Sequence, residues 1–178
     1  SVEKTSKKTF APGLYDLTEL QRDANKKFGY SAKETLNIMQ RLYENHKVLT
    51  YPRTDSRYLS TDVAETIGER LRACAAGPYR KTAAALAAKP IRTNASFVDN
   101  KKVSDHHAII PTEQYVQFEH MTIEERRIYD LVVRRFLAVL YPPFLYEQTL
   151  IQAEAAGEVF TAKGKIVTES GWKAAYEH

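Results

Sequence analysis

Residues 122–143 read TIEERRIYDLVVRRFLAVLYPP and contain the strongest helical pattern in the chain. Thr122 can accept a hydrogen bond from the amide of Glu125, and the Glu125 side chain can return one to the Thr122 amide, which is a capping box. Apolar residues then recur at steps of three and four as far as Leu140. The two prolines that follow cannot continue a helix. The stretch therefore predicts one long amphipathic helix with a sharp end.

Shorter helices are predicted upstream of this one from their capping residues and apolar periodicity. The first should end at Gly29, because glycine is the usual helix stop, and the third should end at Gly77. A short fourth helix is compatible with residues 83–89. The expected N-caps of the first three helices are Thr18 with Gln21 as its capping-box partner, then Ser31 with Glu34 as a further capping box, then Ser60 or Thr61.

The hydrophobic period changes after the long helix. Residues 145–153 are rich in strand formers, residues 158–162 alternate, and Lys-Gly-Lys at 163–165 is typical of a turn into a further strand at 166–168. The polar, lysine-rich start of the chain has no obvious element before Phe10. The sequence therefore predicts a fold that is mainly α with a small β segment and no internal repeat.

Composition narrows the class of protein. The chain has 178 residues, 43% hydrophobic and 27% charged, which indicates a globular protein rather than a disordered one. Its single cysteine cannot form an internal disulfide, and with five scattered histidines it cannot build a usual structural zinc site. We find no apolar run long enough for a membrane span, and we expect a cytoplasmic protein. The lysine-rich opening, without an initial methionine, suggests a piece of something longer.

Basic residues favour a polyanionic partner. The net charge is +4, and residues 80–102 carry six Lys or Arg against Asp99 alone, so that this stretch is expected to be a long surface loop. Arginine pairs at 126–127 and 134–135 are expected on the solvated face of the long helix. These features alone support a non-catalytic helical DNA-binding module.

Residues 49–60, LTYPRTDSRYLS, could carry chemistry. Proline at 52 favours extended geometry for Tyr51, and in an extended segment Arg53 lies on the same side as the Tyr51 phenol. A phenol with a pKa of about 10 is ionised to about one part in a thousand at neutral pH, so a nucleophilic tyrosine needs a nearby cation or base. Arginine also offers two parallel donors to a phosphate. Without further support, a packing or surface role for Tyr51 is the simpler interpretation.

The same run resembles the active-site motif of type IA DNA topoisomerases, in the Tyr-Pro-Arg form typical of the bacterial topoisomerase III branch. Residues 104–112, SDHHAIIPT, are similar to the downstream histidine motif of that family. His107 and Ile110 stand where the topoisomerase I branch usually has Glu and Arg, which favours the topoisomerase III branch. The resemblance extends to three flanking stretches, residues 14–21, residues 40–44, and residues 160–164 with Gly171-Trp172.

The resemblance implies a role for each matching residue. Tyr51 would attack a phosphodiester of single-stranded DNA and leave a 5′-phosphotyrosine, Arg53 would hold the scissile phosphate, and His106 would hydrogen-bond a phosphate. Thr54 and Asp55 match the motif, but a role in shaping the loop is as plausible for them as a contact with DNA. Whether His107 shares the work of His106 stays open.

The family also implies the surroundings of this segment. Residues 1–12 would be the outgoing arm of a β arch (domain II), residues 13–146 the helical tyrosine domain (domain III) inserted into it, and residues 147–178 the returning β segment. Magnesium would be bound by acidic residues of a Toprim domain that this sequence lacks, so we expect no metal site here and no activity of the segment alone. The parent enzyme would need no ATP, act on DNA in the bacterial nucleoid, and be monomeric.

A tyrosine recombinase is a third possibility, because it also forms a phosphotyrosine. Recombinases gather several Arg and His before a tyrosine near the C-terminus. Here the candidate tyrosine precedes the histidines, which argues against that class.

Overall fold

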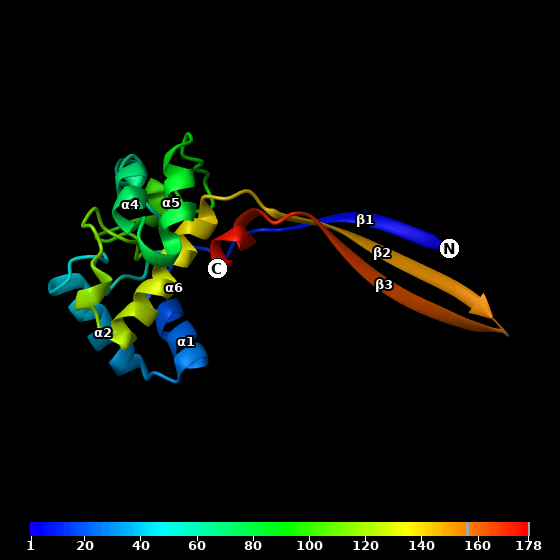
Figure 1. Cartoon of the computed structure of the whole chain (residues 1–178), viewed down its shortest axis with the longest axis horizontal. Coiled ribbons are helices and arrows are strands. Elements are labelled where there is room, and N and C mark those ends of the chain that lie inside the picture. Colours follow the sequence, from blue (N-terminus) through cyan, green and yellow to red (C-terminus); the bar gives the residue numbers. More distant parts are fainter. Residues whose placement is uncertain (156, 178) are drawn as a thin grey trace.

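The computed structural model describes residues 1–155 and 157–177 and has a mixed α/β architecture. A helical body carries a three-stranded antiparallel ribbon that extends away from it (Figure 1). Strand β1 (Val2–Thr9) leads into the body, and β2 (Phe144–Ala155) and β3 (Glu158–Glu169) follow it. The α-helices of the body are α1 (Leu17–Phe28), α2 (Ala32–Glu44), α3 (Thr61–Ala64), α4 (Ile67–Cys74), α5 (Arg80–Ala87) and α6 (Ile123–Val139). Short 3₁₀ helices are η1 (Gly77–Tyr79), η2 (Asn100–Lys102), η3 (Phe118–His120) and η4 (Gly171–Tyr176).

Two of the three predicted capping boxes are confirmed, and the one at Thr18 is wrong. The Glu34 amide donates to Ser31 Oγ at 3.0 Å, and the Glu125 amide donates to Thr122 Oγ1 at 3.1 Å. In each case the glutamate side chain accepts from the amide of the capping residue. The glycine stop of α1 is also confirmed, since Gly29 has a left-handed φ of 74°.

The first and third predicted helices differ from expectation. The N-cap of α1 is Asp16 and not Thr18, because the Asp16 carboxylate accepts from the Glu19 amide at 2.8 Å. Ser60 does cap the third helix, but that helix breaks into α3 and α4 at Thr66 (φ −95°, ψ 1°). The Thr66 hydroxyl donates to the Val63 carbonyl at 2.6 Å, which competes with the helical hydrogen bonds. Helix α4 then ends at Cys74, before Gly77.

The basic stretch 80–102 is only partly a loop. Helix α5 occupies its first eight residues, starting three residues before the expected position, and η2 occupies its last three. Residues 80 and 81 therefore lie on a helix and not on a flexible segment.

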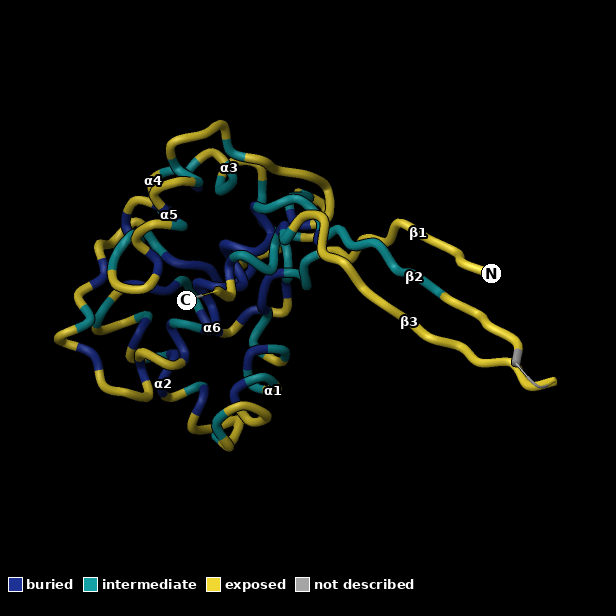
Figure 2. Tube along the Cα trace, turned by 45° about the vertical axis from the view of Figure 1, so that its right-hand side comes forward, coloured by how far each residue is buried: buried dark blue, intermediate teal, exposed yellow. Residues whose placement is uncertain are grey.

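The ribbon corrects two expectations. β1 pairs with β2 along its whole length, although the start of the chain showed no element, and Lys163-Gly164-Lys165 lies inside β3, where Gly164 pairs with Thr149. The chain reverses next to Gly157 (φ 82°) instead, and Ala156 lies outside the described residues. Every described residue of β1 and β3 is exposed (Figure 2), so no buried face imposes a readable alternation.

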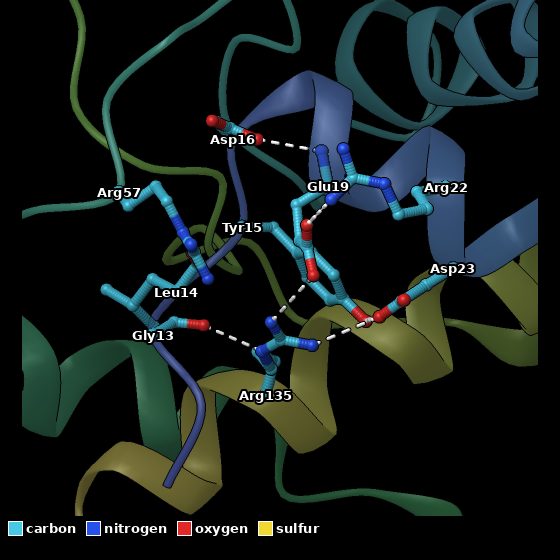
Figure 3. Close-up of polar contacts among 9 residues, drawn as sticks. All are labelled: Gly13, Leu14, Tyr15, Asp16, Glu19, Arg22, Asp23, Arg57 and Arg135. Atoms are coloured by element: carbon cyan, nitrogen blue, oxygen red, sulfur yellow. Dashed lines mark hydrogen bonds and ion pairs between the residues drawn. The ribbon is translucent and has the colours of Figure 1, made fainter.

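Helix α6 lies at the centre of the body. The prediction that its arginine pair at 134–135 is solvated is wrong. Arg134 and Arg135 are buried, at 7% and 6% exposure, and not solvated. Arg135 donates to the Gly13 carbonyl at 2.6 Å and to Asp23 at 3.0 Å, and its guanidinium lies 4.2 Å from the Tyr15 ring centre (Figure 3). These partners satisfy the charge inside the fold.

The two buried arginines also hold the two chain segments where the ribbon joins the body. Arg135 holds the segment that follows β1, and Arg134 donates to the Ala175 carbonyl at 2.9 Å in the segment that follows β3. Trp172 Nε1 links these two segments by donating to the Thr9 carbonyl at 2.9 Å. Along the chain as described, no helix is long and apolar enough to cross a membrane.

Candidate active site

The two motifs singled out in the sequence lie side by side in the body. The Thr50 amide donates to the Ile110 carbonyl at 3.0 Å, and the Ile110 amide donates to Thr50 Oγ1 at 3.0 Å. The Thr112 amide donates to the Val48 carbonyl at 3.0 Å, so the pairing extends from Val48 to Thr50. The segment that leads into Tyr51 is thereby tied to the segment that follows the histidines.

The loop after Tyr51 is held by hydrogen bonds within the loop and to the start of α1. Thr54 is buried, its hydroxyl accepts from the Ser56 amide at 3.1 Å, and its carbonyl accepts from the Leu17 amide at 3.0 Å. Asp55 is exposed. These contacts support the loop-shaping role for Thr54, because its hydroxyl is already engaged and its side chain is out of solvent.

Tyr51 is half-buried between two other rings. The His106 ring stacks on it, with 4.2 Å between ring centres and 27° between planes. Tyr43, from the last turn of α2, meets it edge-on, with 5.4 Å between centres and 78° between planes. The phenol of Tyr51 is therefore held in orientation by a stacked ring on one side and an edge contact with another ring.

His107 differs from His106 in its hydrogen bonding. A carbonyl oxygen only accepts, so the contact of 2.7 Å between His107 Nδ1 and the Ala108 carbonyl requires the proton on Nδ1. Burial lowers the pKa of His107, and the charges of Arg70 and His106 act in the same direction. A neutral His107 then has only an acceptor left at Nε2. The exposed His106 is accordingly the better placed of the two to donate to a phosphate.

Arg53 is exposed at the surface of the same loop. Within the described part of the chain, its guanidinium forms no ion pair or hydrogen bond. Both of its donor edges are therefore free for a ligand, but no contact brings it against the Tyr51 phenol in the way the extended spacing predicted.

A groove of about 640 Å³ lies beside Tyr51. Its lining includes residues that the sequence did not single out as functional, among them Lys47 and Arg70. Arg70 gave no local signal, because it stands on α4 and reaches the groove only through the fold. Tyr43 lies in one of the stretches that carry the resemblance. The lining residues are Tyr43, Glu44, Lys47, Leu49, Thr50, Tyr51, Arg70, Thr112 and Glu113.

The described residues bring together no cluster of ligands that fits magnesium. Among the residues that the structure describes, no group of three or more His, Cys, Asp or Glu side chains lies close enough to hold a metal ion.

Comparison with known proteins gives the class of this chain. The protein family described as DNA topoisomerase matches residues 1–178, and the chain belongs to this family. It is 64% identical over 177 residues to DNA topoisomerase 3 of Bacillus thuringiensis (strain Al Hakam), and 54% identical over 176 residues to DNA topoisomerase 3 of Bacillus subtilis (strain 168). The expected class, a type IA enzyme of the topoisomerase III branch, is confirmed.

The comparisons also measure how much of such an enzyme is present. Each of these alignments covers 99% of this chain and 24% of the relative, so the chain spans about a quarter of the relatives' length. Among solved structures, the full-length topoisomerase I from Thermotoga maritima matches the whole chain with a TM-score of 0.72 at 22% identity, over 29% of its own length. The fold is thus that of one part of a type IA topoisomerase.

Proposed function

We propose that this chain supplies the nucleophile of a topoisomerase III-like, ATP-independent enzyme that cleaves and rejoins one DNA strand. The Tyr51 oxygen would bond to the phosphorus of a phosphodiester, the bond from phosphorus to the 3′ oxygen would break, and the phenol proton would leave as the 3′ oxygen gains one. The stacking of His106 on Tyr51 carries the proposal, because it joins the two motifs at one point. Strand passage before rejoining would change DNA topology or decatenate DNA.

The neighbouring side chains take roles that fit their surroundings. Arg53, exposed and free of protein partners in the described residues, would grip the scissile phosphate with two parallel donors. His106 would donate to that phosphate or the next one. Asp55 is exposed enough to reach DNA, whereas Thr54 and His107 would support the loop.

The ribbon and the body would belong to two different domains of such an enzyme. Residues 1–12 and 147–178 would belong to a β arch (domain II), and residues 13–146 would be the tyrosine domain (domain III). Magnesium would be held by a Toprim domain elsewhere in the enzyme. The substrate would be single-stranded DNA, and the enzyme would work as a monomer. The rival proposal of a non-catalytic module loses support, because two of the arginines it used are buried.

The polarity of the covalent adduct tests this proposal. We expect the full-length enzyme that contains this sequence to retain, after denaturation, the 3′-labelled half of a single-stranded oligonucleotide, with the phosphate on a peptide containing Tyr51. Mass spectrometry of the digested adduct identifies the residue. Retention of the 5′-labelled half would indicate the recombinase polarity, and no adduct would favour the binding module.

The 178-residue chain by itself is expected not to relax DNA. It would lack the charged groups that face Tyr51 in the whole enzyme, and loss of such groups removes several kcal/mol of transition-state stabilisation. Negatively supercoiled plasmid incubated with the purified chain and magnesium should stay supercoiled on a gel, with the full-length enzyme as the positive control. Relaxation by the chain alone would contradict this expectation.

The two histidines should differ in their effect on cleavage. In the full-length enzyme, His106→Ala is expected to slow single-turnover cleavage about ten- to a thousandfold, as for loss of one donor to a developing charge. His107→Ala should slow it less, because the Nδ1 donor of His107 is bound to the Ala108 carbonyl. A labelled single-stranded oligonucleotide gives both rates. A larger effect at His107 would move the phosphate contact one residue later.

A further inference from the structure

We propose that the groove beside Tyr51 binds the first nucleoside of the DNA strand that becomes attached to this tyrosine, and that Lys47 contacts the phosphate that follows this nucleoside. The inference rests on the proposed function. It adds a substrate position to the site and assigns Lys47 a positioning role in it.

The location of the groove follows from the chemistry at Tyr51. When the phosphate is joined to the Tyr51 oxygen, the nucleoside on its 5′ oxygen must lie directly beside the phenol. Tyr51 itself lines the groove, whose volume of about 640 Å³ lies within the range of ~300–1,000 Å³ usual for small-molecule sites. His106, which stacks on the Tyr51 ring, is not among the residues that line the groove.

The lining suits a nucleoside better than a bare phosphate. Its two cations, Lys47 and Arg70, are matched in number by two acids, Glu44 and Glu113, so the groove has no strong net charge. Tyr43 adds an aromatic ring against which a base or sugar can pack, and base–aromatic contacts tolerate any base. A groove with balanced charges and an aromatic ring fits a nucleoside. The phosphate that follows this nucleoside would then lie at the edge of the groove, against the exposed Lys47.

Only one of the two cations is available to a phosphate. The Arg70 guanidinium already donates to Thr66 Oγ1 at 2.8 Å and to the Pro111 carbonyl at 3.0 Å. Lys47 is exposed, and its ammonium group makes no hydrogen bond or ion pair to the residues described. Lys47 is therefore the cation that can bind a phosphate without losing a protein partner.

Lys47 has a strained backbone conformation that a lysine side chain does not favour. Its φ of 58° is left-handed, and it is the only such non-glycine residue in the part of the chain that the structure describes. Glycine or asparagine would be easier to accommodate there. The Thr112 hydroxyl holds this turn by donating to the Lys47 carbonyl at 2.6 Å. Backbone strain of this kind concentrates at functional sites, which is consistent with a use for the side chain.

The test combines a protein change with a matching DNA change. The full-length enzyme and its Lys47→Gly variant each cleave a single-stranded oligonucleotide under single-turnover conditions. They also cleave a version with an uncharged methylphosphonate at the phosphate after the first nucleoside. We expect each change alone to slow cleavage about tenfold, as for one hydrogen bond to a charged group, and both together to slow it no further.

Stability and charge controls separate this role from a structural one. Lys47→Gly removes the left-handed strain, so its melting temperature should be unchanged or higher while its cleavage falls. Lys47→Asn, which also tolerates this backbone, should behave in the same way. Lys33→Ala removes an exposed lysine from the first turn of α2 and should leave both cleavage rates unchanged.

The outcomes distinguish this inference from the proposed function. In one outcome, the unmodified enzyme forms the adduct while the rate losses from the Lys47 change and the methylphosphonate multiply when the two are combined. In that case Lys47 does not contact this phosphate, and the proposed function stands. If the unmodified enzyme forms no adduct with the ordinary oligonucleotide, the proposed function fails and this inference fails with it.

Discussion

Tyr51→Phe in the full-length enzyme is expected to abolish DNA cleavage while leaving the affinity for single-stranded DNA nearly unchanged. The substitution removes only the nucleophilic oxygen. The ring keeps its stacking on His106 and its edge contact with Tyr43, so the local structure should persist. Cleavage is measured as covalent adduct with a labelled oligonucleotide, and binding by fluorescence anisotropy of the same oligonucleotide.

A second tyrosine provides the control for this result. Tyr115 is 66% exposed and outside the groove, so Tyr115→Phe should cleave at the unmodified rate. Adduct formation by the Tyr51→Phe variant would show that another side chain is the nucleophile. A large loss of binding by that variant would show that the phenol contributes to the complex before cleavage.

Arg135→Leu is expected to lower the free energy of unfolding of the purified chain by about 3 kcal/mol. The change removes the donor to the Gly13 carbonyl and leaves Asp23 and Glu19 without their shared cation (Figure 3). It also removes the cation above the Tyr15 ring. Urea unfolding followed by circular dichroism measures the difference between the two proteins.

An exposed arginine on the same helix is the matched control. Arg127 is exposed, and its hydrogen bond to the Tyr30 hydroxyl is at the surface. Arg127→Leu should therefore change the free energy of unfolding by no more than about 0.5 kcal/mol. Equal losses in the two variants would mean that burial of Arg135 contributes nothing beyond a surface contact.

The helices were predictable where their signals are local. Capping boxes at Ser31 and Thr122 and the glycine stop at Gly29 involve residues three or four positions apart, so the sequence displays them directly. The burial of Arg135 was not predictable in this way. A helical period places it away from the main apolar stripe, and only the approach of Gly13 and Asp23 from α1 and its preceding loop gives it partners.

The ribbon and the groove show the same division between local and distant information. β1 has no alternation to detect because both of its faces are exposed, and its pairing partner lies at the far end of the sequence. The motif around Tyr51 could be found by its resemblance to a family. The contribution of Arg70 to the groove could not, because it depends on the packing of α4 against the paired segments.

The pairing of β1 with β2 has a consequence for the order of folding. Thr9 is opposite Phe144, so the whole helical body forms the loop that this pairing closes. Closing so long a loop in an unfolded chain carries a large entropic penalty, whereas a folded body already brings its two ends together. The helices should therefore pack first, and β1 should stay unpaired until they have done so. The hairpin of β2 and β3 can form independently of the body.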